Sequence, residues 1–233
     1  MRGLRRTKQI VATVCCGATI ALAACAEREQ SRCAGASVHV VANTHGTATG
    51  WLTGFGRERN YMVNNYASHL AYGERNAPYA IAFSEVPTAI AMREISPATS
   101  DSLRSALRDG RADLANVFYL ETSPDLTQGE TLMRMGIDSI RWQEAELDTR
   151  PTTAWFIDAN GIHRQIPEIL SHLGVSQFVY GRNPPSDANL HIWRAPSGHE
   201  ALAVFSDSYA HWRPLFQDGA GANENAFNAA YTE

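Results

Sequence analysis

Residues 152–170, TTAWFIDANGIHRQIPEIL, contain one complete strand-and-helix unit. The run TTAWFID, 152–158, is short and rich in aromatic and β-branched residues, which predicts a buried strand ending at Asp158. Apolar side chains then recur at helical spacing, which predicts a helix over 165–173. A strand followed directly by a helix is the repeating unit of a parallel α/β fold.

The same alternation continues on both sides of this unit. Apolar and β-branched runs predict further strands at 38–43, 79–85, 114–121 and 177–181, with weaker strands at 191–193 and 201–205. Helical spacing of apolar residues, such as Met133, Ile137 and Ile140 in the third segment, predicts helices over 58–73, 99–110 and 126–148. The sequence therefore predicts an α/β fold built from parallel βα units.

Length and charge narrow the class of protein. The chain has 233 residues, of which 44% are hydrophobic, which is enough for one globular domain with a sizeable core. The formal net charge is −4, and no run of basic residues occurs beyond the extreme N-terminus. We therefore expect no nucleic-acid partner, because nucleic-acid binding needs a basic surface.

The N-terminus predicts export. Basic residues precede a short apolar run that ends in LAAC, 22–25, and this ending resembles the lipobox of bacterial lipoproteins. We expect a signal peptide at 1–24, a lipid anchor on Cys25 and a polar tether over 25–36. The protein would then face the periplasm or the cell surface from a membrane. Ordinary signal-peptidase cleavage, with Cys25 incidental, is the alternative.

The remaining boundaries follow from composition. The α/β domain is predicted at 37–215, and residues 216–233, rich in Gly, Ala and Asn, are predicted to form a loose tail. If the signal peptide is removed and Cys25 is acylated, Cys33 is the single cysteine left, so no disulfide framework is expected.

Polar residues occur where the predicted strands end. His45 follows the first strand, and Glu85, Glu121 and Asp158 close the next ones. The carboxyl ends of parallel strands meet at one edge of a sheet or barrel, where ligands bind. These residues predict a carboxylate-lined pocket suited to a metal or to acid/base chemistry on a neutral sugar. Each acid taken alone is also a common helix cap.

Aromatic side chains lie near these positions in the sequence. Trp51 follows the first strand in a glycine-containing loop, Trp155 lies within TTAWFID, and Tyr180 and Trp193 lie further along. Aromatic rings can stack on the C–H face of a pyranose while its hydroxyls form hydrogen bonds. We expect Trp51 and Tyr180 to contact a sugar, whereas Trp155, in mid-strand, fits a core position better.

Several of these runs together resemble glycoside hydrolase family 38, the zinc-dependent α-mannosidases. VHVVANTHGTATGWL, 38–52, resembles the family's first strand, His-x-His-x-Asp followed by Gly-Trp, and TTAWFIDANG resembles its Trp-x-Ile-Asp-x-x-Gly signature. IAFSE, LRSALRDGRADLANV, FVYGRNPP and IWRAPSG are similar to intervening and later segments, in order, from about residue 38 to 206.

This resemblance implies a distorted (β/α) barrel, a zinc ion and retaining hydrolysis of terminal α-mannosides through an aspartate nucleophile. It places the nucleophile and a zinc ligand on Asp158, a zinc-binding histidine on His45 and the sugar-facing tryptophan on Trp51. It also places on Arg182 the arginine that orients the nucleophile. Thr47 stands where the family has a metal-binding Asp.

The general acid and the last zinc histidine of the family have no match in this chain. The barrel is therefore predicted to be incomplete, and the hypothesis includes an α-mannosidase-like chain without activity. Glu85 and Glu121 are the candidates for acid/base work within it. Two alternatives stay open: a non-catalytic carbohydrate-binding or interaction lipoprotein on the cell surface, and a fragment without a stable fold.

Overall fold

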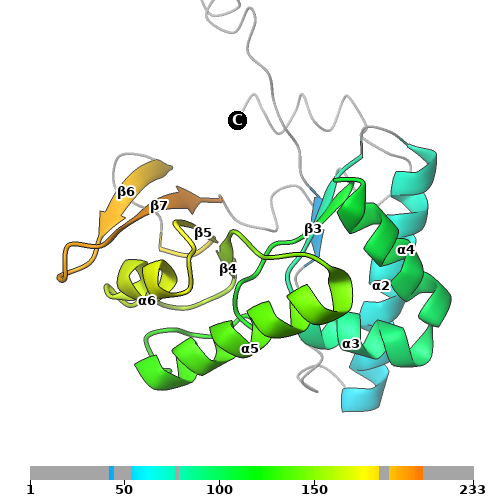
Figure 1. The fold of residues 1–233 in the computed structure, drawn as a ribbon, viewed down its shortest axis with the longest axis horizontal. Helices are drawn as coiled ribbons and strands as arrows, with labels where there is room; N and C mark the ends of the chain where they lie inside the picture. Colours follow the sequence, from blue (N-terminus) through cyan, green and yellow to red (C-terminus); the bar gives the residue numbers. More distant parts are fainter. Residues whose placement is uncertain (1–41, 45–53, 77–78, 184–188, 207–233) are drawn as a thin grey trace, which may run out of the picture. The chain divides into compact units, whose positions relative to one another are not determined.

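A computed structural model of the chain describes residues 42–44, 54–76, 79–183 and 189–206. The chain divides into residues 1–40 and residues 41–233, and every described residue belongs to the second unit. This unit alternates strands and helices along the chain, as the sequence predicts (Figure 1). None of the described helices is long and apolar enough to cross a membrane.

In the described part of the chain the strands form two sheets, and all but one of the pairings are parallel. The first sheet has the order β1-β2-β3 and the second the order β4-β5-β7-β6, with β6 antiparallel to β7. The bounds are Ala42–Thr44 for β1, Ile81–Phe83 for β2, Ala112–Leu114 for β3, Ala154–Phe156 for β4, Gln177–Tyr180 for β5, Leu190–Arg194 for β6 and Glu200–Phe205 for β7. The prediction of an α/β fold built on parallel strands is confirmed.

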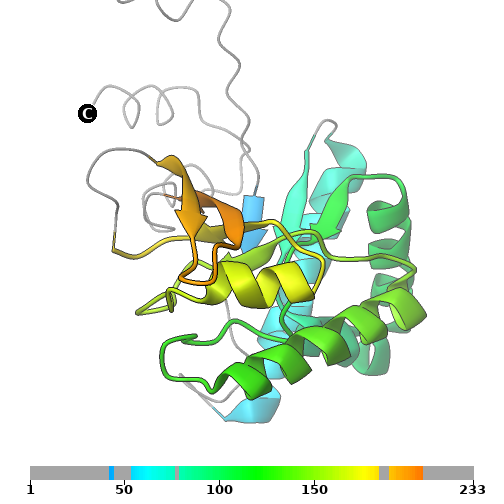
Figure 2. The same cartoon turned by 60° about the vertical axis from the view of Figure 1, so that its left-hand side comes forward.

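Among the residues that the structure describes, five helices lie between the strands along the chain. Figure 2 shows them from a second side. They are α2 (Phe55–Arg75), α3 (Val86–Ile95), α4 (Pro97–Arg108), α5 (Gly129–Leu147) and α6 (Ile166–His172). The sequence predicted all of them except α3. Only two residues separate α3 from the end of β2, and this helix buries residues around much of its circumference, so no single apolar stripe marks it as a helix.

Two other predicted helices differ from the structure in detail. The helix predicted over 99–110 begins at Pro97, two residues earlier, and proline is well tolerated at the first helical position. In α5 the buried face includes Leu132, Gly136 and Ile140, whereas Ile137, one of the apolar residues noted at helical spacing, is 36% exposed.

The third strand is also displaced from its predicted position at 114–121. β3 covers Ala112–Leu114, and the residues after it form a buried irregular segment. Within this segment the Ala115 amide donates to the Phe83 carbonyl at 2.7 Å, and the Val117 amide donates to the Thr153 carbonyl at 2.8 Å. The apolar run that looked like one strand thus crosses from the first sheet to the second.

The core follows from the alternation of side chains along each strand. Ile81, Phe83 and Leu114 pack in a cluster with helices α2, α3 and α4, while Phe156 and Phe178 pack in a cluster with α5 and α6. A third cluster, made of strand residues Ala82 and Trp155 and of Ala115 and Ile157 directly after strands β3 and β4, lies apart from these helices. Helices therefore cover one face of the strands.

Candidate active site

Three charged residues follow parallel strands at the same offset. Glu85 lies two residues beyond the end of β2, Asp158 two beyond β4, and Arg182 two beyond β5. The structure brings Asp158 and Arg182 into direct contact. Glu121 lies seven residues beyond β3, not at its end, but it reaches the same group through hydrogen bonds.

These residues form a chain of hydrogen bonds that we call the carboxylate ladder: Glu85, Glu121, Asp158 and Arg182. Oε1 of Glu85 accepts a hydrogen bond from the backbone amide of Glu121 at 3.0 Å. Oε1 of Glu121 accepts one from the backbone amide of Asp158. Oδ1 of Asp158 then accepts from Nε of Arg182 at 2.5 Å and also from its Nη2. Each carboxylate thus holds the next residue of the ladder.

Burial differs along the ladder. Glu85 is 2% exposed and Glu121 is 9% exposed, whereas the side chain of Asp158 is 29% exposed. Desolvation raises the pKa of Glu85 well above its ordinary value, the charge of Glu121 raises it further, and the Glu121 amide opposes this. The backbone amide of Glu85 donates to the hydroxyl of Tyr66 at 3.2 Å. The ladder therefore begins in the core and ends at a more accessible aspartate.

Gly181 allows Arg182 to approach Asp158. A Cβ atom on Gly181 would lie 2.4 Å from the carbonyl oxygen of Ile157, which is far inside van der Waals contact. The Gly181 amide donates to the carbonyl of Phe156 at 3.3 Å. The end of β5 can therefore lie against the end of β4 only with glycine at this position.

A buried amide network, which the sequence analysis missed, joins the two sheets. Oδ1 of Asn116 accepts hydrogen bonds from the amides of Phe118 at 3.1 Å and Trp155 at 3.2 Å. Nε2 of Gln143 donates to the Asn116 carbonyl and to the hydroxyl of Ser139, both at 3.0 Å. Asn116 and Gln143 are 0% exposed, and a polar residue inside an apolar run was the signal that could have found Asn116.

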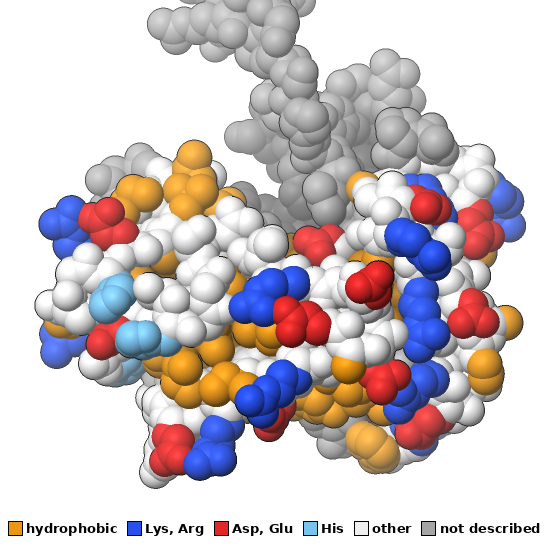
Figure 3. Space-filling view, in the orientation of Figure 1, with side chains coloured by type: hydrophobic (Ala, Val, Ile, Leu, Met, Phe, Trp, Pro, Cys, Tyr) orange, Lys and Arg blue, Asp and Glu red, His pale blue; other side chains and the backbone are white. Residues whose placement is uncertain are grey.

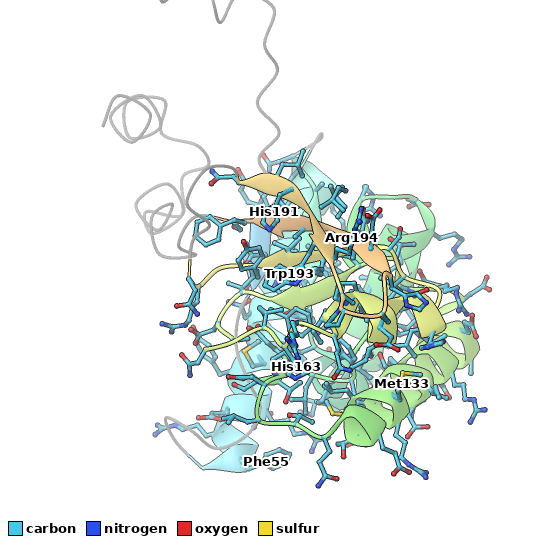
Figure 4. All side chains as sticks on the ribbon, turned by 90° about the vertical axis from the view of Figure 1, so that its left-hand side faces the viewer. Phe55, Met133, His163, His191, Trp193 and Arg194 are labelled. Atoms are coloured by element: carbon cyan, nitrogen blue, oxygen red, sulfur yellow. The ribbon has the colours of Figure 1, made fainter. Side chains whose placement is uncertain are left out.

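Of the two aromatic residues predicted to contact a sugar, Tyr180 is described by the structure and lies in the core. Tyr180 is 3% exposed, and its ring lies 5.3 Å from Phe205 and 6.0 Å from Trp193, centroid to centroid. Figure 4 shows Trp193 and His191 as neighbours on β6. Trp155 is 9% exposed, as expected of a core residue. Nothing in these contacts brings Tyr180 to the carboxylate ladder.

Other predicted site residues fall outside the described residues: His45, Thr47, Trp51 and Cys25. Within the part of the chain that the structure describes, no three His, Cys, Asp or Glu side chains are grouped so that they could hold a metal ion. The face in Figure 3 carries acidic and basic side chains interspersed, with no extended basic patch.

Parallel strands with helices between them, and charged residues gathered beyond the strand ends, define a class of protein: an α/β domain whose candidate site lies at the carboxyl ends of its parallel strands. The chain belongs to the family described as glycosyl hydrolases family 38, N-terminal domain, whose profile matches residues 35–233. The resemblance noted in the sequence is thereby confirmed at the level of the family.

Individual relatives are distant. Alpha-mannosidase G of Dictyostelium discoideum is 19% identical over 166 residues, which are 68% of this chain and 15% of that protein. An alpha-mannosidase from Enterococcus faecalis V583 is similar in fold, with a TM-score of 0.68, 14% identity, and coverage of 82% of this chain and 22% of that one.

A 4-alpha-glucanotransferase from Thermococcus litoralis is also similar in fold, with a TM-score of 0.60 and 13% identity, covering 76% of this chain and 28% of that one. The chain thus spans less than a third of the length of each of these relatives. At such low identity the two structural likenesses establish the fold.

Proposed function

We propose that the protein acts on terminal α-mannosides as a retaining glycosidase, with Asp158 as the nucleophile. The observation that carries the proposal is the double hydrogen bond from Arg182 to Oδ1 of Asp158, beyond the ends of two adjacent parallel strands. Two N–H groups on one carboxylate oxygen fix the rotation of the carboxylate, as an in-line attack on a sugar carbon requires. The family assignment and the name of the Dictyostelium relative support the choice of mannosides.

Zinc fits part of the donor set. Asp158 and His45 would hold the ion, since carboxylate and imidazole are ordinary zinc ligands, whereas the hydroxyl of Thr47 is a poor one. When bound, zinc would supply a positive charge that grips adjacent sugar hydroxyls. We expect about one zinc per purified chain, lost on His45→Ala. A His45→Ala variant with the same metal content as the wild type would contradict this assignment.

The substrate contacts belong to the same proposal. Trp51 would stack on the sugar ring, and a second carboxyl group must protonate the leaving oxygen in a retaining mechanism. Glu85 and Glu121 were the sequence candidates for that acid, but the Oε1 atom of each accepts a backbone amide. These contacts fit the positioning of a backbone amide better than proton transfer.

The location of the protein is a further proposal, carried by the sequence LAAC at 22–25. Acylation of Cys25 would hold the domain on a membrane surface after removal of residues 1–24. We expect metabolic labelling with a fatty acid to mark the wild-type protein and not Cys25→Ser. Labelling of both proteins, or of neither, would contradict the lipid anchor.

A chromogenic aryl α-mannoside tests the activity itself. We expect the purified full chain to release the aryl group and Asp158→Asn to lose on the order of 10³-fold or more in kcat/KM, as removal of a nucleophile usually does. Proton NMR of the first product should show the α anomer, because two displacements retain configuration. Equal rates for the wild type and Asp158→Asn would refute the assignment of the nucleophile.

A further inference from the structure

We propose that Glu121 is a positioning residue for Asp158, and that Glu85 in turn positions Glu121. The side-chain carboxyl group of Glu121 holds the backbone amide of Asp158, and that of Glu85 holds the backbone amide of Glu121. The proposal rests on the proposed function, because it takes Asp158 as the nucleophile. It assigns to both glutamates a task other than acid/base catalysis.

The direction of the hydrogen bonds made by Glu85 and Glu121 supports a positioning role. Both glutamates accept an amide from a residue far along the chain, 36 residues away for Glu85 and 37 for Glu121. The carboxylate of Glu121 therefore lies against the main chain that carries Asp158. A general acid must instead reach the leaving oxygen across the scissile bond from the nucleophile.

The burial of Glu85 and Glu121 also supports a positioning role. At 2% and 9% exposure, neither glutamate has the solvent access of a free surface acid, and burying a carboxyl group is costly unless hydrogen bonds compensate. An amide donor offsets part of that cost and, in exchange, is itself held in place. A buried carboxyl group with this geometry is thus suited to fixing a backbone position.

Asp158, near the end of the carboxylate ladder, is held at both its main chain and its side chain. Asp158 receives the Glu121 carboxylate at its amide and the Arg182 guanidinium at its side chain. The main chain and the side chain of the same residue are therefore held independently. Removing the acceptor at the amide frees the main chain of Asp158 even while Arg182 stays paired, and a misplacement of about 1 Å can cost on the order of 10²-fold in rate.

Amide hydrogen exchange tests the contact without requiring turnover. In full-length protein labelled with ¹⁵N-aspartate, the Asp158 amide is identified by its loss in Asp158→Asn. We expect Glu121→Ala to accelerate exchange of this amide by about 10-fold or more, because it removes the acceptor. Glu121→Gln keeps an Oε1 acceptor and should change exchange by less than about 3-fold.

Two further variants keep the test independent of overall folding. Glu121→Asp retains the charge but withdraws the carboxylate by one methylene, so it should accelerate exchange as Glu121→Ala does. Glu130→Ala, on the exposed face of α5, is the matched control and should leave the Asp158 amide unchanged. Exchange within about 2-fold of wild type in both Glu121→Ala and Glu121→Asp would overturn the proposal.

The aryl α-mannoside assay supplies the catalytic readout. We expect Glu121→Ala to lower kcat by about 10- to 100-fold with KM within about 2-fold, and Glu121→Gln to recover most of the loss. Faster exchange with an unchanged kcat would overturn the positioning role while leaving the glycosidase proposal intact. If the wild type shows no turnover, the glycosidase proposal fails, and the exchange data still decide whether Glu121 holds the amide.

Discussion

Replacing Gly181 with alanine tests whether the close approach of β4 and β5 creates the Asp158–Arg182 pair. The new Cβ would lie 2.4 Å from the Ile157 carbonyl oxygen, and the three atoms nearest to it are all backbone atoms of Ile157. Backbone atoms cannot rotate away as the end of a flexible side chain can. The end of β5 must therefore move by about 1 Å to restore an ordinary contact.

The energetic cost has two parts. Overpacking of this kind costs about 1–3 kcal/mol, and loss of the hydrogen bond from the Gly181 amide to Phe156, already 3.3 Å long, adds about 1 kcal/mol. We expect the free energy of unfolding to fall by about 2–4 kcal/mol. For a domain of this size that corresponds to a decrease in Tm of roughly 4–16 °C.

Thermal and urea unfolding followed by tryptophan fluorescence measure this change. Gly56→Ala, near the start of α2, is the matched control, because a Cβ there meets nothing within 4 Å. That variant should be unchanged or more stable by up to about 1 kcal/mol, since alanine favours a helix. If Gly181→Ala unfolds at the same midpoint as Gly56→Ala, the steric argument for the Asp158–Arg182 geometry is refuted.

Three further predictions concern the surroundings of the site. Asn116→Ala should lower the free energy of unfolding by about 2–4 kcal/mol, measured in urea, because it leaves two buried amides without their acceptor; a loss below about 0.5 kcal/mol would contradict the bridging role. Because the pKa of Glu85 is raised on folding, the unfolded state releases this proton first, so stability should fall as pH rises above about 4.5. Glu85→Gln should remove this component and raise Tm relative to wild type more at pH 8 than at pH 5, and a difference independent of pH would contradict it. Gly136→Ala should lower Tm less than Gly181→Ala does, because the atom that its Cβ would approach to 2.4 Å is the end of the Leu173 side chain, and Leu173→Ala should cost less stability in the Gly136→Ala background than in the wild type.

Several parts of the fold could be predicted because they depend on neighbours in the sequence. The strand in TTAWFID and the buried positions Met62, Tyr66 and Leu70 of α2 are marked by local periodicity. The third strand was misplaced because an apolar run records burial and not which sheet is joined. Residues 115–118 are buried in a crossing between sheets, where Asn116 replaces the regular pairing of backbone groups.

The candidate site divides in the same way. The acids Glu85 and Asp158 were visible as residues that follow apolar strands, and parallel strands place such residues at one edge, whereas Arg182 was identified through the family resemblance. Their roles were not visible, because a carboxylate after a strand can cap a helix, bind a metal, carry out chemistry or hold a backbone amide. Which of these roles a carboxylate has depends on which hydrogen-bond donor or ligand the folded chain places next to it.

The sequence by itself determined the alternation of strands and helices, the family, and the position of the acids beyond the strand ends, since each is written in spacing along the chain. The tertiary structure decided that the Glu85 side chain accepts the Glu121 amide and that the Glu121 side chain accepts the Asp158 amide. It also decided that Gly181 leaves room for Arg182 to reach Asp158. The hydrogen bonds of the first two pairs join residues 36 and 37 positions apart, and the Gly181 approach depends on the packing of β5 against β4. No local pattern encodes such contacts, because they exist only when separate βα units pack side by side.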